Sequence, residues 1–79
     1  MARYREDRLM ALQHAIVLQC LKDIQTPEKR VYYWGEVMES LELYAPLYHM
    51  TPSEMVKSAI RSGYIKGMKE SEVDDYGRH

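Results

Sequence analysis

The sequence has little of the chemistry on which many small proteins depend. It contains one cysteine in 79 residues, so no disulfide can form within the chain and the disulfide-stapled secreted class is excluded. It has no Gly-rich phosphate loop, no cysteine pair and no helical His-Glu spacing that would bind a metal. No pair of carboxylates is placed against an apolar pattern. We therefore expect no enzyme, no metal site and no cofactor.

No hydrophobic run is long enough to span a bilayer. The longest stretch without Asp, Glu, Lys or Arg covers residues 9–21 and is interrupted by Gln13, His14 and Gln19. The segment before it carries charges of both signs, and no small-residue cleavage site follows, so we expect no signal peptide. These absences predict a cytoplasmic protein that does not associate with a membrane.

The residues that are present have the composition of a small folded domain. Hydrophobic residues make up 46% of the chain, charged residues 29%, and the formal net charge is −1. A chain of this length buries about 60 to 65% of the surface of its unfolded form, enough for one modest core. We predict a single domain over residues 1–79, with residues 74–79 frayed.

Two apolar stripes run along a long helix predicted over residues 4–23. The first stripe has spacings of three and four and is predicted to face the core; it consists of Leu9, Leu12, Ile16, Cys20 and Ile24. The second consists of Met10, His14, Leu18 and Leu21. A helix that is apolar on two sides usually has two neighbours. We therefore predict a homodimer in which the second stripe forms the interface.

The middle of the chain predicts a very short strand followed by a helix. Residues 31–34 are β-branched and aromatic, which favours a strand. A helix is expected to begin at Gly35 and to end before Ala45, because Pro46 excludes the helical conformation of Ala45. The connection over residues 45–50 is unusually apolar and is expected to pack against the core.

The strongest local signal is Thr51-Pro52-Ser53-Glu54, a capping box with proline at the first helical position. It predicts a helix that starts here and ends at Gly63 in the left-handed conformation. Residues 64–65 are then expected to form a strand. After a turn, residues 70–73 are expected to form a ragged return strand.

Charge is segregated along the chain. Residues 36–56 contain four Glu and no basic residue, whereas residues 57–69 contain Lys57, Arg61, Lys66 and Lys69 and no acidic residue. Lys57 and Arg61 lie on the side of the capped helix opposite its apolar residues. This outer face carries cations and serine hydroxyls, which are the groups that contact phosphates and base edges in DNA.

This order of elements resembles the winged helix-turn-helix domains of prokaryotic and phage transcription regulators, over Leu9–Val73. The likeness rests on residues 35–41 as supporting helix, 51–61 as recognition helix and 62–65 as the start of the wing. It implies a mainly α fold with a small β component: helix, short strand, helix, helix and a ragged β-hairpin wing. It also implies a transcription regulator that binds duplex DNA through Ser53, Lys57, Ser58 and Arg61, with Lys66 and Lys69 on phosphates.

A second hypothesis places the same fold in a different functional class. Winged helices also bind proteins, and the acidic return strand is compatible with that use. In this interpretation the protein is an adaptor or inhibitor. It contacts a host protein through the aromatic and acidic residues Tyr33, Trp34, Glu36 and Glu39.

Overall fold

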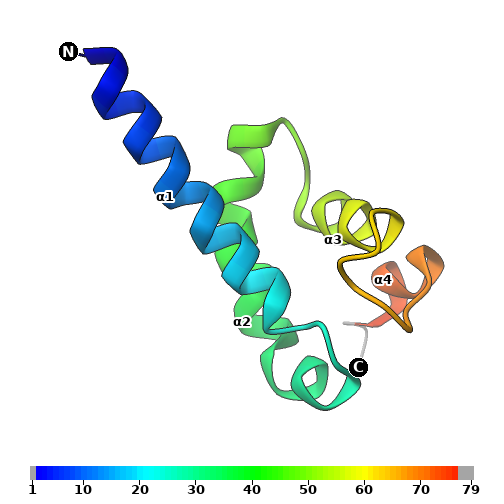
Figure 1. Ribbon diagram of the computed structural model, residues 1–79. Helices are drawn as coiled ribbons and strands as arrows, with labels where there is room; N and C mark the ends of the chain where they lie inside the picture. Colours follow the sequence, from blue (N-terminus) through cyan, green and yellow to red (C-terminus); the bar gives the residue numbers. More distant parts are fainter. Residues whose placement is uncertain (1, 77–79) are drawn as a thin grey trace.

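The computed structural model describes the backbone of residues 2–76 and the side chains of residues 8–76. The chain forms the helices α1 (Ala2–Lys22), α2 (Pro27–Tyr44), α3 (Pro52–Arg61) and α4 (Glu70–Tyr76), with a 3₁₀ helix, η1 (Ala45–Tyr48), after α2 (Figure 1). No strand occurs among residues 2–76. The prediction of a winged helix with a β-hairpin wing is therefore wrong.

The strand predicted over residues 31–34 lies inside α2. This helix begins much earlier than expected because Thr26 caps it: the backbone N–H of Lys29 donates to Thr26 Oγ1 at 3.3 Å, and Pro27 occupies the first helical position. As part of α2, Trp34 packs into the core and is buried. Packing therefore overrides the strand preference of this segment.

The predicted wing is a loop followed by α4. Residues 64–69 form the loop, and the supposed return strand is helical from Glu70 to Tyr76. Glu70 and Glu72 lie in the first turn of α4, where the helix dipole favours negative charge. The chain stays helical through residues 74–76, where the sequence predicts fraying; residues 77–79 lie outside the described residues.

Both ends of α3 are stabilised as predicted, with one difference: the Glu54 carboxylate accepts from the Thr51 hydroxyl, whereas in a capping box it accepts from the Thr51 backbone N–H. The backbone N–H of Glu54 donates to Thr51 Oγ1 at 3.2 Å, and the Thr51 hydroxyl in turn donates to Glu54 Oε1 at 3.1 Å. At the other end Gly63 has φ of 83°, in the left-handed region. The N–H groups of Gly63 and Tyr64 donate to the carbonyls of Ile60 and Ala59, which is a Schellman motif.

Replacing the cap residue tests how much this start signal stabilises the domain. We expect Thr51→Ala to lower the free energy of unfolding by about 1 kcal/mol, because the Glu54 N–H loses its acceptor. Ser53→Ala, two residues further along the same turn, is the control and should change stability by less than about 0.5 kcal/mol. Urea denaturation followed by circular dichroism measures both; equal values for the two variants would contradict the assignment.

The core forms where α2, α3 and α4 meet the C-terminal half of α1. Its fully buried members are Ile24, Leu41, Ala45 and Val56, with Ile65 at 1% exposure. Its other buried hydrophobic members are Val17, Leu21, Trp34, Val37, Met55, Ala59, Met68 and Val73.

The face of α1 predicted to be buried is only partly so. Leu9 and Leu12 are 57% and 61% exposed and Ile16 is also exposed, whereas Cys20 is half-buried and only Ile24 is fully buried. Val17 and Leu21 contribute to the core instead. The reason is the length of α1: the other helices cover only its second half, and from residue 8 to residue 16 no side chain is buried.

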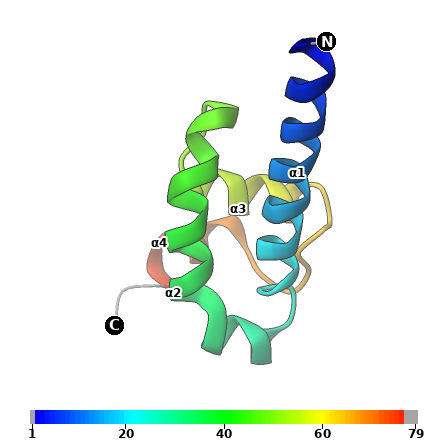
Figure 2. The same ribbon diagram turned by 90° about the vertical axis from the view of Figure 1, so that its left-hand side faces the viewer.

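The N-terminal part of α1 extends beyond the other helices (Figures 1 and 2). The molecule therefore measures 46 × 22 × 18 Å, and its radius of gyration is 13.3 Å. A compact chain of this length would have a radius of about 11.6 Å. This segment lacks the packing that normally maintains a helix. We expect it to be only marginally stable, because an isolated helix of so few turns is marginal in water.

A buried arginine connects three parts of the chain. Arg30 is 4% exposed, and its guanidinium donates to the carbonyl oxygens of Ile24 at 3.0 Å, Gln25 at 3.1 Å and Lys66 at 3.4 Å. Among residues 8–76 no carboxylate pairs with it. Arg30 thus links the α1–α2 connection to the loop that precedes α4.

Candidate functional site

Two of the four cations expected to contact DNA are paired with carboxylates of α4. Lys57 Nζ lies 2.9 Å from Asp74 Oδ2, and Arg61 Nη1 lies 2.6 Å from Glu70 Oε1. The helix that replaces the wing therefore packs along the basic side of α3, anchored by the buried Val73. Sequence-independent DNA affinity comes from cations that neutralise phosphates. Here two of the four clustered cations already have an anionic partner.

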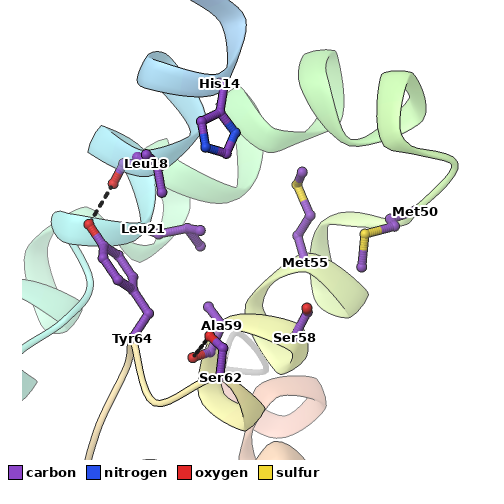
Figure 3. Close-up of a pocket in the computed structure, with 9 residues that line it drawn as sticks. All are labelled: His14, Leu18, Leu21, Met50, Met55, Ser58, Ala59, Ser62 and Tyr64. Carbon is purple, nitrogen blue, oxygen red and sulfur yellow. Dashed lines mark hydrogen bonds between the residues drawn. The ribbon is translucent and has the colours of Figure 1, made fainter. Parts of the chain in front are cut away.

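The remaining residues of the expected DNA-binding set do not form one surface with them. Ser58 lies on the side of α3 that faces α1, where it lines a groove rather than the outer face (Figure 3). Ser53 is half-buried at the start of α3. Lys66 and Lys69 are exposed on the loop before α4. The structure thus brings Lys57 and Arg61 together but separates Ser58 from them.

An apolar groove lies between α1 and α3. It has a volume of about 290 Å³ and is lined by His14, Leu18, Leu21, Met50, Met55, Ser58, Ala59, Ser62 and Tyr64 (Figure 3). Two of its polar groups already have partners, since Tyr64 donates its hydroxyl to the carbonyl of Leu18 at 3.3 Å and Ser62 donates to that of Ala59 at 3.0 Å. The groove therefore offers mainly hydrocarbon and thioether surface.

A second recess adjoins this groove, because His14 lines both. It has a volume of about 610 Å³ and lies between α1 and η1, lined by Met10, Ala11, Gln13, His14, Leu47 and Tyr48. We call the two recesses together the docking groove. Two of its methionines, Met50 just before α3 and Met55 within α3, have flexible side chains that adapt readily to a bound surface.

The predicted dimer interface coincides with one wall of the docking groove. Met10, His14 and Leu18 are exposed and line it, whereas Leu21 is 7% exposed and belongs to the core. The predicted stripe is therefore on the surface for three of its four residues. Burial of Leu21 follows from its place in the C-terminal half of α1, which the other helices cover.

Sequence reasoning missed the opposite wall. Leu47 is exposed and Tyr48 is 37% exposed, although the connection that contains them was expected to pack against the core. Ala45 alone is buried in η1, and Met50 is half-buried. The unusual apolar content of residues 45–50 was the available signal. Ala45 and Met50 pack in or against the core as expected, whereas Leu47 and Tyr48 form an exposed wall.

The residues proposed to contact a host protein are only partly accessible. Tyr33, Glu36 and Glu39 are exposed on α2. Trp34 is buried, and its ring lies 4.6 Å from that of Tyr76 between centroids, at an interplanar angle of 47°. Trp34 therefore holds α4 against α2, and its expected role in partner contact is wrong because the ring is covered.

The described residues include no cluster that could bind a metal ion. No group of three or more His, Cys, Asp or Glu side chains among them is placed to hold a metal ion. None of the helices within residues 2–76 has the length and apolar character needed to cross a lipid bilayer. The expectation that the protein has no enzyme activity, metal site or cofactor stays a prediction.

Cys20 has the environment of an unreactive thiol. Burial raises the pKa of Cys20 above its ordinary value, a hydrogen bond with Ser40 counteracts part of the rise, and the Asp23 carboxylate adds to it. Because the folded state favours the neutral thiol, it holds more protons than the unfolded state near that pKa. The stability contributed by this group is therefore lost as pH rises through the raised pKa.

We expect iodoacetamide to modify Cys20 several-fold more slowly in the native protein than in urea at about pH 8, because the thiolate is the reactive form. The rate of mass addition measures this difference. A free thiol peptide in the same urea concentration controls for the denaturant. Equal rates for folded and unfolded protein would contradict the assigned environment.

Comparison of the chain with protein families, with curated protein sequences and with solved structures finds no match. The functional argument therefore rests on the surface itself.

Proposed function

We propose that this protein is a small helical interaction module, which acts by binding protein through the docking groove rather than by binding DNA. The observation that carries the proposal is the exposed apolar surface of the groove. Monomeric proteins rarely leave contiguous apolar patches larger than a few hundred Å² in contact with water, and larger ones mark interaction sites.

The charge distribution supports a protein partner over nucleic acid. Residues 9–21, which supply the α1 wall of the groove, contain no Asp, Glu, Lys or Arg. A DNA-binding surface needs several cations free to neutralise phosphates, whereas Lys57 and Arg61 are paired with Asp74 and Glu70. The groove offers methionine, leucine and tyrosine side chains, and Met and Tyr are enriched in protein interfaces.

The test compares the tagged wild type with two variants, and with one control variant, in two assays. Capture from a lysate of the source cells, quantified by mass spectrometry, is expected to enrich a defined protein set that Met10→Glu loses and Lys57→Ala/Arg61→Ala retains. In a duplex-shift assay at low salt, none of the three forms is expected to bind DNA tightly. Val31→Glu is the matched control for the groove variant, because Val31 is 72% exposed and lies on α2 outside the groove.

The opposite pattern would support the regulator hypothesis instead. Duplex binding that falls steeply with salt and is lost in Lys57→Ala/Arg61→Ala would mean that DNA displaces α4 from the basic side of α3. Protein capture that is unchanged by Met10→Glu would remove the groove from the account.

A further inference from the structure

We infer that the docking groove is occupied by a second copy of this chain, with the two α1 helices antiparallel across a two-fold axis at His14. The inference rests on the proposed function, because it names the partner at the same groove. Three features of α1 lead to it: the symmetry of its stripe, its lack of charge, and the segment that extends beyond the other helices.

The stripe along the groove has the same chemistry when read in either direction. Met10, His14 and Leu18 are spaced by four residues, so they form one ridge along the helix with His14 at its centre. If a second α1 runs antiparallel on this ridge, Met10 of each copy meets Leu18 of the other, and the two His14 side chains meet at the axis. Both apolar positions are then paired, and the interface is isologous and closed.

The absence of charge favours a copy of the same chain over a partner of opposite charge. Identical surfaces that carry a net charge repel each other when they meet at a two-fold axis. Residues 9–21 carry no Asp, Glu, Lys or Arg on any side of the helix, so this penalty is absent. A helix in contact with water usually has a charged face, and α1 lacks one over this stretch.

The exposed area supplies more than half of what a standard dimer interface requires. Met10 is 64% exposed and Leu18 38% exposed, and Leu47 and Tyr48 of η1 stand on the other side of the groove. Together with His14 these side chains expose on the order of 500 Å², toward the upper end of the about 300 to 600 Å² that monomers leave uncovered. The flanking Ala11 and Gln13 extend this area toward the about 800 Å² per partner of a standard interface.

The extended end of α1 provides the occupant. In the antiparallel arrangement, residues 8–16 of each copy, where no side chain is buried, lie against residues 12–20 of the other copy. The contact then covers a segment that is otherwise marginal as an isolated helix. Each copy thus supplies both the groove and the helix that fills it.

The oligomeric state and a charge-pair rescue test the arrangement. Light scattering coupled to gel filtration should give twice the mass of one chain for the wild type and for Val31→Glu. Met10→Glu and Leu18→Glu should each weaken dimerisation about tenfold or more, since each buries a charge against an apolar side chain. The double variant Met10→Glu/Leu18→Lys should recover part of the affinity, because the two-fold axis places position 10 of one copy against position 18 of the other.

Disulfide trapping tests the position of the axis. In a Cys20→Ser background, His14→Cys should form an intermolecular disulfide on mild oxidation, whereas Val31→Cys in the same background should not become cross-linked. Circular dichroism confirms that each variant is folded. A wild type that stays monomeric at submillimolar concentration, or trapping that is equal at positions 14 and 31, would overturn the inference. If lysate capture is still lost in Met10→Glu, the partner is another protein and the proposed function stands; if capture is unchanged as well, both fail.

Discussion

Leu41→Ala is expected to lower the free energy of unfolding by about 3 kcal/mol, whereas Leu43→Ala, two residues later on the same helix, is expected to change it by less than about 0.5 kcal/mol. Leu41 is 0% exposed in the core and Leu43 is 73% exposed. The same atoms are removed from the same helix in both variants, so the difference between them reports burial alone.

The loss at Leu41 is large for a domain of this size. Small domains are stable by only about 5 kcal/mol or somewhat more, so Leu41→Ala should populate the unfolded state visibly at elevated temperature. Urea denaturation followed by tryptophan fluorescence measures the loss, because Trp34 is buried against Tyr76. Similar midpoints for the two variants would mean that α2 does not face the core as described.

The second large effect is expected at Arg30. Arg30→Met should lower the free energy of unfolding by about 3 kcal/mol, because three buried or half-buried carbonyls lose their donor at once. Arg30→Lys should recover only part of the loss, since a single ammonium group cannot reproduce the planar fork of donors. Lys29→Met, at the exposed neighbouring position, is the control and should cost less than about 0.5 kcal/mol.

Urea denaturation also measures the Arg30 series. If Arg30→Met were as stable as Lys29→Met, the guanidinium would not link the loop before α4 to the α1–α2 connection. Amide exchange then locates the effect: in Arg30→Met the amides around Lys66 should exchange faster than in the wild type, because that carbonyl contact is lost.

The helix starts show how far local sequence signals determine this fold. Thr51-Pro52 correctly predicts the start of α3, and Thr26-Pro27 has the same chemistry and starts α2. The aromatic run at residues 31–34 favours a strand and so places the start of this helix too late, at Gly35. A capping residue with proline after it is a stronger guide here than intrinsic strand preference, which packing readily overrides.

The last third of the chain could not be predicted from local signals. Residues 70–73 contain one good strand former, Val73, and the acidic residues around it are equally suited to the first turn of a helix. The helical outcome depends on contacts with α3: burial of Val73 and the pairs Lys57–Asp74 and Arg61–Glu70. These pairs join residues that are distant in sequence, so they cannot be predicted from the local spacing of apolar residues.

The buried side of α1 was only partly predictable for a similar reason. Periodicity correctly identifies a long helix with two apolar stripes, but it cannot say how much of its length the rest of the chain covers. Here only the second half is covered. Residues of both stripes therefore remain exposed in the first half, and the proposed dimer interface rests on those of the second stripe, Met10, His14 and Leu18.

The most direct test of the account is amide hydrogen exchange of residues 9–12 in α1, measured by NMR over a range of protein concentrations. These residues lie where the helix extends beyond its own core. If a second copy covers them, their protection should rise with concentration, while that of core amides such as Leu41 should change much less. Rapid exchange at residues 9–12 that is independent of concentration would contradict the claim that this surface is an interface between copies.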